Sequence, residues 1–194
     1  IDILTEQELG NTKVDARANY NYGRDAYRSS SYNRLFLPEY TQNSQSESSH
    51  GSKQRSYGGN FRFDGHWGKN SFWNTRVDFS RSDHRNWSRS SDSIFTDFAS
   101  ISTTHTSNSS RSISKNVDWS GGFTQYFGEE RQTEVGISGS YGYNNGQSTS
   151  TNTSQTRFYL MGDSLRIVDH VIETPSERHN ASAQARLRHR FGEY

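Results

Sequence analysis

The chain has 194 residues, of which 28% are hydrophobic and 13% aromatic, and its formal net charge is +1. The near-zero charge gives no electrostatic footprint for nucleic acid, and the absence of cysteine excludes a disulfide framework and cysteine-ligated zinc. A soluble domain normally has about 45–50% apolar residues, so this chain is too poor in Leu, Ile and Val for an ordinary core. Its aromatics and strict alternation distinguish it from a disordered chain.

Six segments alternate apolar and polar residues with a period of two, which predicts strands with one apolar and one polar face. In chain order, strands are expected over residues 12–34, 55–67, 72–88, 112–127, 131–145 and 178–191. Polar segments predict long outer loops over residues 35–54, 89–111 and 146–177. Residues 1–10 are expected to form an acidic lead-in, and a small hairpin is expected within the third loop, around Gly162-Asp163.

The apolar face of these strands has no second sheet available to cover it. We therefore expect lipid to cover it, because only every second residue of a transmembrane β-strand needs to be apolar. The clearest strand, over residues 133–143, presents apolar residues at its odd positions and Glu, Gly and Ser at its even positions. The predicted lipid-facing residues are Phe61, Phe63, Val77, Phe79, Val135, Ile137 and Leu187.

Three arginines, Arg186, Arg188 and Arg190, share the other face of the last predicted strand. A lipid-facing arginine costs about 2–4 kcal/mol at the bilayer midplane. The row is therefore predicted to face a wet interior or a plug, near acidic side chains of neighbouring strands. A solvated face of a soluble sheet is the alternative.

Short turns near residues 68–71 and 128–131 alternate with the long polar segments, as in bacterial outer-membrane barrels. If Trp67 and Trp73 share a face, paired residues must both be odd-numbered, which predicts turns of about three or five residues. Aromatics near the short turns and further along the strands, such as Tyr20 and Tyr141, fit two interfacial girdles.

No catalytic constellation is recognisable in the sequence. The seven histidines are scattered without metal-ligand spacing, and no isolated acidic pair indicates acid–base chemistry. We therefore expect no enzyme activity, cofactor or metal. Aromatics in the predicted loop regions either bind a ligand or pack the loops together, since exposed loop aromatics often bind. The candidate ligand contacts are Tyr32, Tyr40, Trp87, Phe158 and Tyr159.

Several segments carry a family resemblance. They are Ala18-Asn19-Tyr20-Asn21-Tyr22, Ser56-Tyr57-Gly58-Gly59-Asn60-Phe61-Arg62-Phe63, Asp163-Ser164-Leu165 and Arg188-His189-Arg190-Phe191-Gly192-Glu193, together with the Ser/Asn tracts. In pattern the chain resembles the outer-membrane β-barrel region of TonB-dependent-receptor-like proteins of Bacteroidota. The resemblance implies an outer-membrane location, a barrel of about 22 strands and energised uptake of a bulky nutrient. It also implies coupling to TonB through a plug and motif that these residues do not contain.

The predicted fold is all-β, an antiparallel up-and-down meander of about six long strands that forms part of a larger transmembrane β-barrel. Six strands cannot close a membrane barrel, because the smallest have about eight. The expected partners are membrane lipid, the remaining barrel strands or a plug from the same or another chain, TonB and a surface lipoprotein, but no nucleic acid.

Two other functions remain open. One is a structural or secretion-linked outer-membrane barrel whose loops dock a surface lipoprotein, which the presence or absence of an upstream plug domain would distinguish from a receptor. The other is a soluble β-sandwich adhesin module, which needs two sheets sharing an apolar core.

Overall fold

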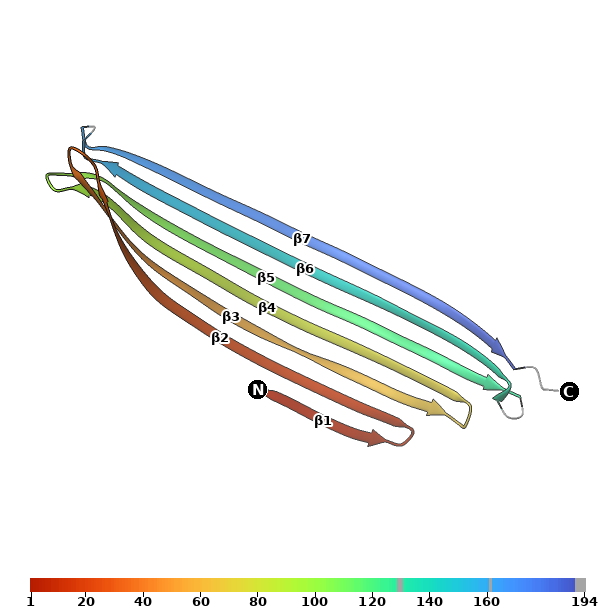
Figure 1. Cartoon of the computed structure of the whole chain (residues 1–194). Helices are drawn as coiled ribbons and strands as arrows, with labels where there is room; N and C mark the ends of the chain where they lie inside the picture. Colours follow the sequence, from red (N-terminus) through yellow and green to blue (C-terminus); the bar gives the residue numbers. More distant parts are fainter. Residues whose placement is uncertain (129–130, 161, 191–194) are drawn as a thin grey trace.

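The computed structural model describes residues 1–128, 131–160 and 162–190. These residues form one antiparallel up-and-down sheet in which the spatial order of the strands is their chain order (Figure 1). The strands are β1 (Asp2–Leu9), β2 (Thr12–Phe36), β3 (Thr41–Trp67), β4 (Ser71–Thr96), β5 (Ser100–Phe127), β6 (Thr133–Phe158) and β7 (Ser164–His189). The all-β meander is confirmed, with β1 and β7 as its two edges.

The strands are much longer than the alternation predicted. Residues 35–54, 89–111 and 146–177, expected as long loops, are mostly the continuations of β2 to β7, and the remaining connections are short turns. The lead-in over residues 1–10 is also mostly strand, because β1 pairs with β2 from Asp2↔Asn19 to Leu9↔Thr12. The prediction failed in these regions because pairing with neighbouring strands, rather than local apolar alternation, makes them strands.

The expected register is confirmed at the short turns. Trp67 pairs with Ser71, which leaves the three-residue turn 68–70, and Phe127 pairs with Thr133 across residues 128–132. Gly68 and Gly128 have positive φ angles of 66° and 83°, which glycine adopts without steric cost. Glu129 and Glu130, which were expected to complete the second turn, lie outside the described residues, as do Phe191 and the closing residues 192–194.

The hairpin expected near Gly162-Asp163 is present, but it is the turn between the full-length strands β6 and β7 rather than a separate element. Asp163 has a φ of 55° and receives two hydrogen bonds of 2.6 Å from the Arg157 guanidinium. These bonds lower the pKa of the Asp163 carboxyl from its ordinary value.

Glycines of β3 make room for large aromatic side chains of β4. Gly65 lies directly opposite Trp73, and Gly59 lies directly opposite Phe79. A Cβ atom at Gly65 would lie 2.5 Å from the Trp73 indole, so the ring covers the glycine backbone. This cross-strand pairing of a glycine with an aromatic residue helps to fix the register of a sheet.

The sheet has no hydrophobic core. Among the described residues no apolar side chain is buried, and the single buried polar side chain belongs to Asn43. Its amide oxygen accepts hydrogen bonds from Tyr32 Oη at 2.6 Å and from Arg34 Nε at 3.0 Å. Backbone pairing therefore holds the strands together, and both faces of the sheet remain open.

Candidate functional site

The two faces of the sheet follow from the register. Residues directly opposite each other in a ladder point to the same side, so Ala16, Phe61 and Val77 share a face. We call this side the band face and the other side the opposite face. The band face carries the odd-numbered residues of β1 and β3–β7 and the even-numbered residues of β2, except at the start of β5, where the register shifts and Ser100 pairs with Phe95.

A charge-free and mainly apolar band crosses the band face next to the short turns. It covers residues 12–22, 57–67, 71–79, 117–127, 133–143 and 181–189 of β2 to β7. At its band-face positions the chain has no Asp, Glu, Lys or Arg. All seven predicted lipid-facing residues lie on this face: Phe61, Phe63, Val77, Phe79, Val135, Ile137 and Leu187. The length of the band on each strand matches the about 9–11 residues of a tilted membrane-crossing strand.

Nothing in the described part of the chain covers this band. Phe61 is 45% exposed, Ile137 59% and Leu187 74%. The described residues form one sheet, so no second layer packs against these side chains. A contiguous apolar surface of this kind marks a site of interaction with protein or membrane.

Aromatic residues border the band on both sides. Trp67, Trp73 and Phe123 cluster near the short turns, with ring centroids of Trp67 lying 6.2 Å from Trp73 and 6.0 Å from Phe123. Along the other border lie tyrosines, among them Tyr22 and Tyr57. Tryptophan and tyrosine favour boundaries where one end of the side chain is apolar and the other is wet.

Behind the band, the opposite face carries charges in pairs. Arg62 and Asp64 form an ion pair of 2.6 Å on β3, and Arg76 forms a pair of the same length with Asp78 on β4. Each pair joins residues two apart on one strand, so their side chains necessarily lie on the same side. Charged side chains are therefore confined to the opposite face along this part of the sheet.

The predicted arginine row also lies on the opposite face. Arg186 pairs in register with Gly136, and its Nε lies 4.0 Å from the carboxylate of Glu134 on the neighbouring strand. Arg188 is directly opposite Glu134. The backbone N–H of Arg190 donates to the carbonyl of Gln132 at 2.9 Å. The arginines thus share a face with the ion pairs and not with the band.

Beyond the band the distribution of charged side chains between the two faces reverses. On the opposite face, the outer parts of β3, β5 and β6 carry no Asp, Glu, Lys or Arg, and hydroxyl and amide side chains bond across strands instead. Ser29 Oγ lies 2.7 Å from Ser48 Oγ, and Thr104 Oγ1 lies 3.1 Å from Thr156 Oγ1. Most of the charged side chains now lie on the band face. Sequence reasoning missed this reversal, although stepping by two residues past Tyr57 would have found it.

The structure does not bring the five candidate ligand-binding aromatics together. Tyr32, Trp87 and Phe158 lie on strands rather than in loops, and Tyr40 and Tyr159 flank two different turns. Tyr32 and Trp87 share the band face, but their pairing rows are six residues apart along the sheet, about 20 Å. Phe158 is on the opposite face. Their assignment to ligand binding stays a prediction.

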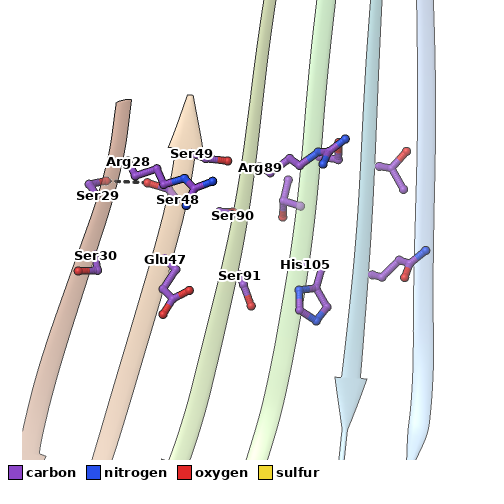
Figure 2. Close-up of a pocket in the computed structure, with 14 residues that line it drawn as sticks. Arg28, Ser29, Ser30, Glu47, Ser48, Ser49, Arg89, Ser90, Ser91 and His105 are labelled. Atoms are coloured by element: carbon purple, nitrogen blue, oxygen red, sulfur yellow. Dashed lines mark hydrogen bonds between the residues drawn. The ribbon is translucent and has the colours of Figure 1, made fainter. Parts of the chain in front are cut away.

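A hollow with a volume of about 710 Å³ lies in the outer part of β2 to β6 (Figure 2). Arg28, Glu47, Arg89 and His105 line it together with serines, and none of the five candidate aromatics does. Arg28, Glu47, Arg89 and His105 each come from a different strand, and Figure 2 shows the Ser29–Ser48 hydrogen bond beside Arg28. The hollow is an open polar depression and presents no converging set of catalytic groups.

Among the described residues, no group of three or more His, Asp or Glu side chains is placed to hold a metal ion. No helix in the described part of the chain is long and apolar enough to cross a membrane. No protein-family model matches the chain, and no curated protein is significantly similar to it.

Proposed function

We propose that the chain forms part of the wall of a transmembrane β-barrel in a bacterial outer membrane, with the band face toward lipid and the opposite face toward the interior. The exposed, charge-free apolar band is the observation that carries the proposal. A band of eleven residues, as over 133–143, spans about 33 Å along a strand and about 26 Å along the normal at a tilt near 38°. This height is close to the apolar band of about 25 Å in such barrels.

The stagger of the turns supports the same geometry. Thr12 pairs with Gly65, two residues before the end of β3, and Ser71 pairs with Gln125, two residues before the end of β5. Each short hairpin therefore extends two residues beyond the one before it. A shift of two residues per hairpin is one residue per strand, or roughly 3.3 Å along the strand for each 4.8 Å of spacing between strands. If the short turns all lie in one plane, the strands must therefore be tilted by about 35° from the normal to that plane. Transmembrane barrels have tilts of about 35–45°.

The two edges of the sheet call for further strands. Backbone groups on the outer sides of β1 and β7 have no strand partner within the described residues. An open edge cannot lie in hydrocarbon, because each unsatisfied backbone group there costs several kilocalories per mole. We infer that remaining barrel strands, from the same or another chain, close the wall, and that a plug or water fills the interior.

The resemblance to TonB-dependent-receptor-like proteins extends this proposal to a receptor or transporter that takes up a bulky nutrient. Its coupling to TonB would use a segment outside these residues, and a surface lipoprotein would assist capture. The strands β2 to β7 continue well beyond the band (Figure 1), and their outer parts are rich in polar residues, which fits ligand capture outside the membrane. A structural or secretion-linked barrel would have the same wall, whereas the single sheet does not favour a soluble sandwich.

Fractionation of cells that make the intact protein tests the membrane assignment. We expect the protein in the outer-membrane fraction after washes with carbonate and with urea, and its release only by detergent. Recovery in the soluble fraction without detergent would overturn the proposal. If the protein is in the outer membrane, detection of a plug domain within the same protein would favour the receptor over the structural barrel.

A further inference from the structure

A cluster of cations lies on the band face directly beyond the apolar band. It occupies the three successive pairing rows that pass through Arg81, Asp83 and Arg85 of β4, and it extends over β2 to β5. We call it the basic belt; its members are Arg24, Lys53, Arg55, Arg81, Arg85, Arg111 and Lys115. In these rows of β2 to β5 the sole acidic side chain on the band face is Asp83.

The belt places like charges directly opposite one another. One row runs Arg24↔Lys53↔Arg85↔Arg111 across four adjacent strands, at a spacing of about 5 Å from strand to strand. Cross-strand pairs of like charge destabilise a sheet. The arrangement is therefore unfavourable in isolation and indicates that an anion outside the sheet balances it.

Partners within the chain balance only a small part of this charge. Asp83 forms ion pairs with Arg111 at 2.7 Å and with Arg85 at 3.3 Å. Hydrogen bonds from Arg111 foremost, with those from Arg85, lower the pKa of Asp83 to about 2. Arg24 and Lys115 have neither an ion pair nor a hydrogen bond to any side chain among the described residues.

Acidic residues in the same rows lie further away. Glu173 and Glu177 of β7 are separated from β5 by the uncharged residues Thr149 and Asn145 of β6. Two strand spacings place them about 10 Å from the β5 cations, which is more than the Debye length of about 8 Å at physiological salt. In these rows the band face is therefore basic over β2 to β5 and acidic over β7, and the glutamates do not neutralise the belt.

Tyrosines of the band border hold the belt against the apolar surface. The Lys53 ammonium and the Arg55 guanidinium lie 5.9 Å and 5.8 Å from the ring centroid of Tyr22. Arg81 lies 5.9 Å from the ring of Tyr57. These three cationic heads therefore lie at the level where an apolar environment would give way to water.

We propose that the basic belt binds the phosphate groups of an anionic lipid at the outer surface of the membrane. This inference rests on the proposed function, because it requires the band to lie in a bilayer. Acyl chains would pack on the apolar band while phosphate oxygens accept hydrogen bonds from the guanidinium and ammonium groups, which are the usual phosphate ligands. Lipid phosphate at this level also relieves the repulsion between the facing cations.

The test compares binding of diphosphorylated and dephosphorylated lipid A to the intact protein, purified in a neutral detergent, by native mass spectrometry. The variant Arg24→Gln/Lys53→Gln removes two facing belt cations. At about 1 kcal/mol per cation near an anionic surface, it should bind the diphosphorylated lipid about 25-fold more weakly. Binding of the dephosphorylated lipid should not change.

The variant Arg166→Gln/Arg178→Gln is the matched control, because it removes the same charge from the opposite face of β7. It should bind both lipids as the parent protein does. In detergent without anionic lipid, the belt variant should melt close to the temperature of the parent protein, because the relief of repulsion between the facing cations offsets the loss of the Lys53–Tyr22 contact.

Equal affinity of the parent protein for the two lipids would overturn the belt proposal, as would equal losses in the belt and control variants. Inorganic phosphate that competes as effectively as the lipid would assign the belt to soluble anions and would also overturn it. These outcomes leave the membrane assignment standing, whereas a protein that fractionates as soluble refutes the proposed function itself.

Discussion

The effect of the substitution Ile137→Arg on stability distinguishes a band face covered by lipid from one covered by water. Ile137 lies on the band face of β6, near the middle of the band over residues 133–143, and is 59% exposed. If lipid covers it, Ile137→Arg should lower the free energy of unfolding by about 2–4 kcal/mol, the cost of a lipid-facing arginine at the bilayer midplane. If water covers it, the change should stay within about 0.5 kcal/mol, as for most surface substitutions.

The neighbouring residue supplies the matched control. Ser138 is at the same depth but points to the opposite face, where Gly122 and Gln184 are its partners in the pairing row. Ser138→Arg should therefore change the free energy of unfolding by less than about 1 kcal/mol. Both variants add one arginine to the same strand, so the difference between their free energies of unfolding reports only the face on which the arginine lies.

The assay is a urea titration of the intact protein folded into phospholipid vesicles, followed by tryptophan fluorescence in both directions to establish reversibility. The difference between the two variants should be at least about 1 kcal/mol, with Ile137→Arg the less stable. Equal free energies for the two variants would refute the reasoning, and a less stable Ser138→Arg would reverse the assignment of the faces.

Three further predictions concern single features of the sheet. Gly65→Ala should destabilise the protein by about 1–3 kcal/mol in the same titration, because the added Cβ would displace the Trp73 indole. Gly23→Ala is the control and should be neutral or slightly stabilising, because the space around Gly23 is open. Equal effects of the two substitutions would contradict this packing. Asp83→Asn should cost about 1 kcal/mol at pH 7 and progressively less as the pH falls through 2, because the lowered pKa of Asp83 gives stability that is complete above its ordinary value of 3.8 and is lost as the carboxyl of the folded protein is protonated. A cost independent of pH would exclude the ion pairs as its cause. Gly68→Ala should cost about 1 kcal/mol in urea unfolding, because alanine is strained at a φ of 66°, and an unchanged midpoint would contradict the turn geometry.

The band and its short turns could be predicted from the sequence because one face had to be apolar. Alternation over residues 57–67 and 133–143 identifies the strand, its face and the parity of its register. The same logic placed Arg186 and Arg188 opposite the band. These inferences depend on residues that are near one another in the chain, which is where sequence patterns are informative.

The outer halves of the strands could not be predicted, because both of their faces are polar. Residues 102–116 of β5 are rich in Ser, Thr and Asn, which favour turns in isolation, and they become strand by pairing with β4 and β6. β1 was missed because Thr5 and Gln7 interrupt its apolar face. The basic belt was missed because its cations come from four strands and meet only once the register is known.

The central claim is that acyl chains cover the band face between the short turns and the tyrosine border. A spin-label accessibility scan tests it most directly, because the 194 residues contain no cysteine and each position from 133 to 143 can carry one label. In bilayers, labels at odd positions should collide mainly with oxygen, and labels at even positions with a water-soluble nickel chelate. Accessibility to the chelate at the odd positions, or no period of two along β6, would contradict the account.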